Sequence, residues 1–205
     1  MSNPKIFPPG PVQWSGENPG MYLKESQDGP FTGLASFFRV DYSPHGHGVG
    51  VVLLEAPDAA QSRPEALNIC VSDNEPMARW LVAHYVSTFG AFKGQPGLGG
   101  IEYLAMTGNT TRNNMPQSYG EDLRADGVEI SLTWSKLGQP FAVDMPGDMG
   151  PTGVYRMFSL FVDCDEAEAV VNGRRLRGKS FKRDFQGRES TTAFLAFAET
   201  WIDPR

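Results

Sequence analysis

The chain has 205 residues, of which 40% are apolar and 20% charged, a composition that is typical of a globular protein of about one domain and excludes a disordered chain. Its 23 glycines and 16 prolines argue against a helical bundle and favour many short elements joined by turns. The net charge of −6 argues against a general nucleic-acid binder, and no apolar run reaches the length of about 18 residues that a membrane-spanning helix needs.

Residues 1–30 hold six prolines and four glycines, which suit neither a helix nor a central strand. We expect an extended arm there, followed by a single β-rich domain over residues 31–205. Apolar side chains in the arm, Trp14 among them, can pack on the domain or on a second copy of the chain in a homo-oligomer. The first ten residues lack the apolar core of a signal peptide, and the two cysteines are read as reduced, buried thiols, so a cytoplasmic protein is expected.

From residue 31 onward the pattern is that of short strands rich in β-branched and aromatic residues. Residues 128–134 alternate strictly between apolar and polar, as a half-buried strand does. Asn172 and Gly173 form the dipeptide most favoured in a two-residue hairpin turn. The expected strands cover residues 31–42, 49–54, 66–71, 101–106, 128–134, 141–143, 154–162, 167–171 and 191–201.

One amphipathic helix is predicted over residues 75–89. Asp73 and Asn74 can cap its beginning, Pro76 fits a first turn, and Gly90 can end it. Apolar residues at three- and four-residue spacing predict that one face packs across the sheet. A second helix of a single turn is conceivable at residues 121–124. The fold class is therefore mainly β, an antiparallel barrel or sandwich of about nine short strands with one packed helix.

Signatures of nucleotide cofactors and of serine hydrolases do not occur, so no cofactor is predicted. His45 and His47 would point to the same face of a strand, a spacing that can bind a metal with Glu55 as a third ligand. The glycines and the proline around these histidines favour a surface turn instead. No metal is therefore predicted, and the two histidines are kept as weak candidates.

A cavity between the helix and the sheet is the candidate catalytic site. His84 and Tyr85 would reach it from the helix, and Glu102 or Glu199 from strands, which would give the histidine–carboxylate pair of an acid–base site. Strict alternation along residues 191–201 places Glu199 on the face of Leu195. The alternatives are a core histidine with its hydrogen bonds satisfied and a carboxylate that faces solvent.

Ligand-binding residues are predicted among arginines and aromatic side chains. Arg39 and Arg156 interrupt apolar strands and, if they point inward, could bind a carboxylate or enolate. Trp80, Tyr103 and Trp134 are candidate apolar contacts for the same molecule. Residues 174–188 carry seven basic side chains against a single acidic one, so we expect a carboxylate-bearing ligand or acidic neighbours beside that segment.

These features favour a cofactor-independent enzyme of isomerase, cyclase or lyase type, acting by acid–base chemistry on a small, largely apolar or aromatic molecule in a barrel-like cavity. A non-catalytic, lipocalin-like carrier of a hydrophobic molecule is the first alternative, and a protein-interaction module is the second. A pair of inward titratable groups would favour the enzyme, and an entirely apolar cavity the carrier.

Overall fold

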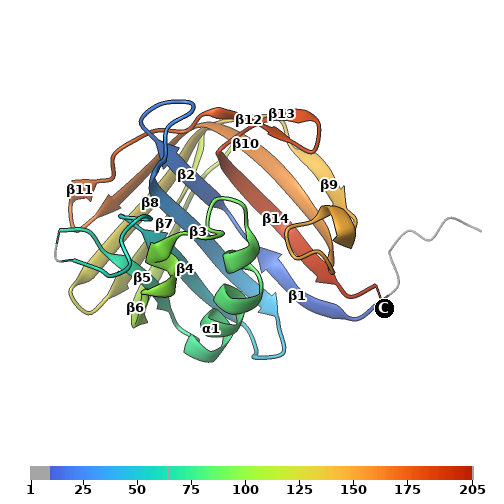
Figure 1. Cartoon of the computed structure of the whole chain (residues 1–205), viewed down its shortest axis with the longest axis horizontal. Coiled ribbons are helices and arrows are strands. Elements are labelled where there is room, and N and C mark those ends of the chain that lie inside the picture. Colours follow the sequence, from blue (N-terminus) through green and yellow to red (C-terminus); the bar gives the residue numbers. More distant parts are fainter. Residues whose placement is uncertain (1–9, 64, 205) are drawn as a thin grey trace, which may run out of the picture.

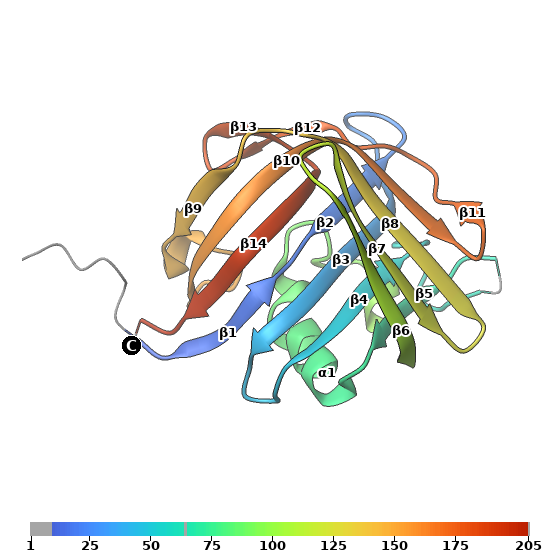
Figure 2. The same cartoon turned by 180° about the vertical axis from the view of Figure 1, so that it is seen from behind.

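The computed structural model describes residues 10–63 and 65–204 and shows a closed β-barrel (Figures 1 and 2). Neighbouring strands of the barrel are antiparallel except for one parallel pair. Within those residues nine strands form the ring. In spatial order they are β14 (Ala193–Ile202), β2 (Gly20–Lys24), β3 (Phe31–Tyr42), β4 (Gly48–Leu54), β5 (Asn68–Ser72), β6 (Glu102–Asn114), β7 (Ser118–Ala125), β8 (Val128–Leu137) and β10 (Arg156–Val171).

Pairing of β14 with β10 closes the ring, so the architecture is a barrel rather than a sandwich. Neighbours cannot all be antiparallel around a ring with an odd number of strands, and β5 and β6 are the parallel pair. A parallel connection needs a long crossover, usually helical. The segment between β5 and β6 supplies it with α1 (Glu75–His84), η1 (Val86–Thr88) and α2 (Pro96–Gly99). The predicted fold class, mainly β with one packed helix, is confirmed.

The remaining elements lie at the margins of the barrel. Strand β1 (Val12–Glu17) pairs with β14 and β3, β9 (Phe141–Met145) pairs with β10, and β11 (Arg174–Arg175) pairs with the end of β10. A separate two-stranded sheet consists of β12 (Lys182–Phe185) and β13 (Arg188–Thr191), and η2 (Gly147–Met149) follows β9. No helix within the described residues is long and apolar enough to cross a membrane.

Helix α1 begins where its capping residues predict. The Asn74 side chain accepts a hydrogen bond from the Met77 backbone N–H at 3.1 Å, and a proline lies in the first turn. The helix ends at His84, earlier than the predicted residue 89. Tyr85 leaves the helical conformation with φ −127° and ψ −64°, and the three residues after it form the short 3₁₀ turn η1 instead. The predicted helix is thus correct at its start and too long at its end.

The barrel wall separates two apolar cores. Inside the barrel, Phe37, Leu132 and Trp134 are fully buried. On the outer face, Leu34 and Phe38 pack beneath α1, which Figure 1 shows lying in front of β3 and β4. Strands β6, β7 and β8 cross the side that faces away from α1 (Figure 2). Each strand residue therefore belongs either to the interior or to the outer face, according to its parity along the strand.

Three expectations differ from the observed elements. Residues 12–24, expected as part of an extended arm, form β1 and β2 within the main sheet, while residues 1–9 of that arm lie outside the described residues. Residues 121–124 belong to β7 and not to a helical turn. Residues 154–162 and 167–171 form one continuous strand, β10. The predicted hairpin turn at Asn172 and Gly173 is present, with φ of 50° and 75°.

Candidate functional site

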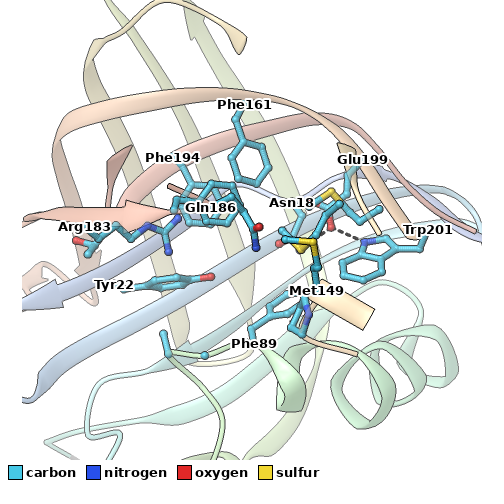
Figure 3. A pocket seen from close by; sticks show the side chains of 18 of the residues that line it. Asn18, Tyr22, Phe89, Met149, Phe161, Arg183, Gln186, Phe194, Glu199 and Trp201 are labelled. Atoms are coloured by element: carbon cyan, nitrogen blue, oxygen red, sulfur yellow. Dashed lines mark hydrogen bonds between the residues drawn. The ribbon is translucent and has the colours of Figure 1, made fainter. Parts of the chain in front are cut away.

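A cavity of about 490 Å³ lies outside the barrel wall, between the outer face of the sheet, the segment after α1, and the β12–β13 hairpin. Its size falls within the range of small-molecule sites. Most of the surrounding side chains are aromatic or apolar, and a few polar groups converge on the space (Figure 3). The polar side chains that line it are Asn18, Tyr22, Lys24, Arg183, Gln186, Thr192 and Glu199.

The direction of the Glu199 side chain depends on a bulge in β14. Along this strand Leu195 points into the barrel and Phe194 points to the outer face. Strict alternation would place Glu199 with Leu195, as the sequence predicts. The register between β14 and β10 shifts beside Ala198, whose φ is 50°, so one additional residue is inserted there. The bulge turns Glu199 to the outer face and into the cavity, which corrects the predicted orientation.

The Glu199 carboxyl is buried, with 3% of the residue exposed, so the solvent-facing alternative is wrong. Its Oε1 accepts hydrogen bonds from Trp201 Nε1 at 2.7 Å and from Asn18 Nδ2 at 3.4 Å (Figure 3). Burial raises the pKa of this carboxyl to about 7, and the two donated hydrogen bonds limit the rise. Both bonds from described side chains end on Oε1, which leaves Oε2 to meet a bound molecule.

The orientation of Asn18 is fixed from the barrel wall. Its side-chain oxygen accepts a hydrogen bond from the Ser36 hydroxyl at 2.8 Å, and its backbone N–H donates to the Ala196 carbonyl at 2.8 Å. With the amide oxygen occupied in this way, the amide NH₂ group points to Glu199. Asn18 and Trp201 therefore act as neutral donors that position the carboxyl and favour its ionised form.

The hairpin β12–β13 brings a second polar group to the cavity. Along β12 the half-buried Arg183 and Phe185 alternate with exposed residues. The two-residue turn at Gln186 and Gly187, with φ of 57° and 76°, ends the strand beside the cavity. Sequence reasoning found Arg183 only as one member of the basic segment. The signal that could have selected it is its alternation with phenylalanine, which marks the buried face of the hairpin.

The predicted catalytic residues are not brought together. Glu199 lines the cavity, but His84 is exposed on α1 and Glu102 is exposed at the start of β6. Tyr85 is buried, and its ring centroid lies 5.2 Å from that of Trp201. It packs behind Trp201 and does not line the cavity. The predicted inward position of His84 is wrong because the buried stripe of α1 consists of Met77, Ala78, Leu81 and Val82.

The predicted ligand-binding residues also lie away from the cavity. Arg39 points into the barrel, where it forms ion pairs with Glu17 at 2.6 Å and Glu121 at 2.9 Å. Arg156 pairs with an aspartate of β9 on the surface. Trp134 is fully buried in the barrel interior and donates to a backbone carbonyl of β2 at 2.9 Å.

Trp80 and Tyr103 belong to the rim of the outer core. Both are partly buried, and the Tyr103 ring lies 3.8 Å from the Arg79 guanidinium. Burial raises the pKa of Tyr103 to about 12. Neither residue lines the cavity, so their placement gives no support for the predicted ligand contacts.

His45 and His47 lie in the exposed turn between β3 and β4 and not on a strand. Their backbone carbonyls both accept hydrogen bonds from the Asn74 side chain, at 3.0 and 2.9 Å. Glu55 is used elsewhere, in an ion pair with Arg174. Across the residues that the structure describes, no group of three metal-ligating side chains comes together.

The basic segment at residues 174–188 has acidic neighbours, as its charge predicts. Arg174 pairs with Glu55 at 2.7 Å, Arg175 with Glu168 at 2.8 Å, and Lys182 with Glu189 at 2.6 Å. The last two pairs are exposed at both partners and contribute about 0–1 kcal/mol each, whereas the Glu55 side chain is buried. Arg177 also lies 3.7 Å from Glu25, so four of the seven basic side chains have acidic partners, and Arg183 is the member that turns to the cavity.

Comparison of the chain with known protein families, with curated proteins and with solved structures gives no match. The site is therefore characterised by its own geometry: a cavity with aromatic walls, a buried carboxyl and a partly buried guanidinium.

The raised pKa of Glu199 predicts a loss of stability as the pH rises. The unfolded chain ionises this carboxyl near 4.5 and the folded protein near 7, so between those values the folded state binds more protons. Its contribution is complete below about pH 4.5 and is lost as the pH rises through about 7, by roughly 3 kcal/mol in all. Urea unfolding at about pH 5 and about pH 8 should show this loss in the wild type and not in Glu199→Gln.

Glu102→Gln is the matched control for that measurement, because it removes an exposed carboxyl that does not line the cavity. The control should keep the pH dependence of the wild type. Equal pH dependence in the wild type and in Glu199→Gln would show that Glu199 ionises normally in the folded protein. The charged groups that share its cavity, Arg183 and Lys24, are present in all three proteins.

Proposed function

We propose that the protein is a cofactor-independent enzyme that binds a small, largely apolar organic molecule in this cavity and moves a proton on it with Glu199. The observation that supports the proposal is a buried carboxyl that lines an apolar cavity with its pKa raised to about 7. A general acid or base works best when its pKa is near the operating pH. Carboxyl groups with this property cluster at functional sites.

The chemistry that fits is isomerisation, cyclisation or elimination through an enolate. Ionised Glu199 takes a proton from a carbon next to a carbonyl group, and the electron pair of that C–H bond passes to the carbonyl oxygen. Protonated Glu199 then returns the proton to another atom of the same molecule, so an isomerisation is balanced without a co-reactant. Burial raises the pKa of Tyr22 to about 12, so its hydroxyl stays protonated and can donate to the developing oxyanion.

A carrier of a hydrophobic molecule is the second candidate. The aromatic walls of the cavity favour it, because Phe89, Phe161, Phe185 and Phe194 offer apolar contact that requires no chemistry. In a carrier, Glu199 would serve only as a hydrogen-bonding group for the cargo.

The experiment that separates the two is solvent-deuterium exchange. Native mass spectrometry before and after denaturation would first reveal any molecule that co-purifies. The purified protein in D₂O would then be given that molecule, together with 4-acetylbenzoate and its methyl ester as enolisable aryl ketones, and NMR would follow exchange at carbon. An acid–base enzyme accelerates exchange above the rate without protein, and a carrier binds without doing so. Binding with no acceleration for any of these molecules would overturn the proposal in favour of the carrier.

A further inference from the structure

Arg183 is a largely enclosed cation that forms no ion pair with a described carboxylate, although the charge of Asp163 favours its charged form. Arg39, Arg156 and Arg174 all form ion pairs with carboxylates of the protein, whereas no described acidic side chain lies within ion-pair distance of Arg183. Its guanidinium carbon lies 4.9 Å from the Phe194 ring centroid. Burial lowers the pKa of this guanidinium, yet an arginine side chain remains charged at any physiological pH.

Its hydrogen-bonding capacity is also unused. A guanidinium carries five N–H donors, and no hydrogen bond joins those of Arg183 to another described side chain or to a described backbone carbonyl. The Nε atom is fully buried without a partner. Because an unpaired buried donor costs free energy, and a charged one costs more, this side chain favours a ligand that accepts hydrogen bonds and carries negative charge.

The surroundings of Arg183 set the shape of that ligand. The guanidinium carbon lies 5.7 Å from the ring centroid of Tyr22 and 5.0 Å from that of Phe185. Together with Phe194, these rings hold the guanidinium at one end of the cavity. Figure 3 shows Glu199 at the other end, with aromatic side chains between the two. A molecule that spans the cavity would therefore place an anionic group at one end and a reactive carbon at the other.

We propose that the cavity takes a small carboxylic acid with an aromatic or alicyclic body, whose carboxylate binds Arg183 and whose opposite end lies at Glu199. A planar carboxylate matches the planar guanidinium and accepts two parallel hydrogen bonds from it. The other cation of the lining, Lys24, already donates to the Gln27 backbone carbonyl at 3.2 Å. The guanidinium alone balances one negative charge, which favours a carboxylate over a phosphate dianion. The inference rests on the proposed function only for the identity of the reactive end.

The test compares 4-acetylbenzoate, whose enolisable methyl group lies opposite its carboxylate, with its methyl ester by titration calorimetry. The wild type should bind the acid roughly 10- to 100-fold more tightly than the ester, the usual effect of a hydrogen bond to a charged group. Arg183→Gln should abolish this preference and leave ester binding nearly unchanged. Arg188→Gln removes the same charge from an exposed position on the same hairpin and should retain the preference. Arg183→Lys, which keeps the charge without the planar fork, should retain part of it.

The outcomes distinguish this inference from the proposed function. Equal affinity for acid and ester in the wild type, or a preference that survives Arg183→Gln, would overturn the inference even if deuterium exchange occurs. A preference that depends on Arg183, together with no exchange, would support the inference and overturn the enzyme in favour of a carrier of carboxylic acids. If Arg183→Gln does not fold, as judged by circular dichroism, Arg183→Lys and Arg188→Gln decide the question.

Discussion

Glu199→Gln should lower the rate of deuterium exchange about 10²- to 10⁴-fold, the usual contribution of one positioned acid or base. The substitution keeps the shape of the side chain and an Oε1 atom that can accept the hydrogen bonds from Trp201 and Asn18. It removes the carboxylate that accepts the proton. Ligand affinity should change much less than the rate, because binding depends on the aromatic walls. Equal losses of affinity and rate would show that the side chain holds the ligand without taking part in proton transfer.

The pH dependence of the rate gives an independent check on the same group. Because the ionised carboxylate accepts the proton, the rate should rise with pH around a midpoint near 7. Trp201→Phe removes the donor 2.7 Å from Oε1 and retains an aromatic ring. Since that hydrogen bond favours the carboxylate, its loss should move the midpoint to higher pH. A midpoint that stays in place would show that Trp201 supports the fold and does not position Glu199.

Local patterns predicted much of the fold because the strands alternate regularly and the turn and cap residues are specific. Asn74 marks the start of α1, and Asn172 with Gly173 marks a hairpin, because these residues offer conformations or hydrogen bonds that few others do. Strand β7 was missed, because Glu121 interrupts its apolar face with a charge. That charge is stable in the barrel because side chains of β3 and β6 donate hydrogen bonds to it. A local sequence pattern contains no information about such contacts between strands.

The site was less predictable, because it depends on two features that arise in three dimensions. Glu199 was correctly chosen as an unusual carboxylate in an apolar strand, but its direction depends on the bulge at Ala198. Alanine seldom takes a positive φ, so the residue type gives no warning of the bulge. The role of Arg183 depends on how the hairpin folds over β14, and its charge was masked among neighbouring basic residues.

A polar cluster inside the barrel shows how a buried charge is held when it serves the fold. Glu121 is fully buried and accepts hydrogen bonds from Arg39 at 2.9 Å, Tyr119 at 2.6 Å, Asn109 at 2.9 Å and Thr111 at 3.0 Å. Every one of these donors comes from within the barrel strands β3, β6 and β7. Arg39 was predicted to bind the carboxylate or enolate of a ligand, but its partners are carboxylates of the protein itself. Glu199 differs because its Oε2 faces a cavity.

Glu121→Ala should destabilise the protein by about 3 kcal/mol, because it leaves a partly buried guanidinium and several donors without an acceptor. Arg39 is 28% exposed, so water will offset part of the loss. Glu17→Ala is the matched control: it removes the other carboxylate on Arg39, which is itself 28% exposed, and should cost less than about 1 kcal/mol. Urea unfolding measures both free energies of unfolding.

Glu121→Ala also tests whether the two buried carboxylates, Glu121 and Glu199, have separate roles. Glu121 lies on the inner side of the barrel wall and the cavity lies on the outer side, so folded Glu121→Ala should keep the exchange rate of the wild type. Replacing Arg39 and Glu121 together, as Arg39→Met with Glu121→Leu, should recover much of the lost stability, because the fully buried charge is removed and only the partly exposed Glu17 loses its partner. An equal cost for Glu121→Ala and Glu17→Ala would contradict this account, since burial of the acceptor is the physical reason for the difference between them.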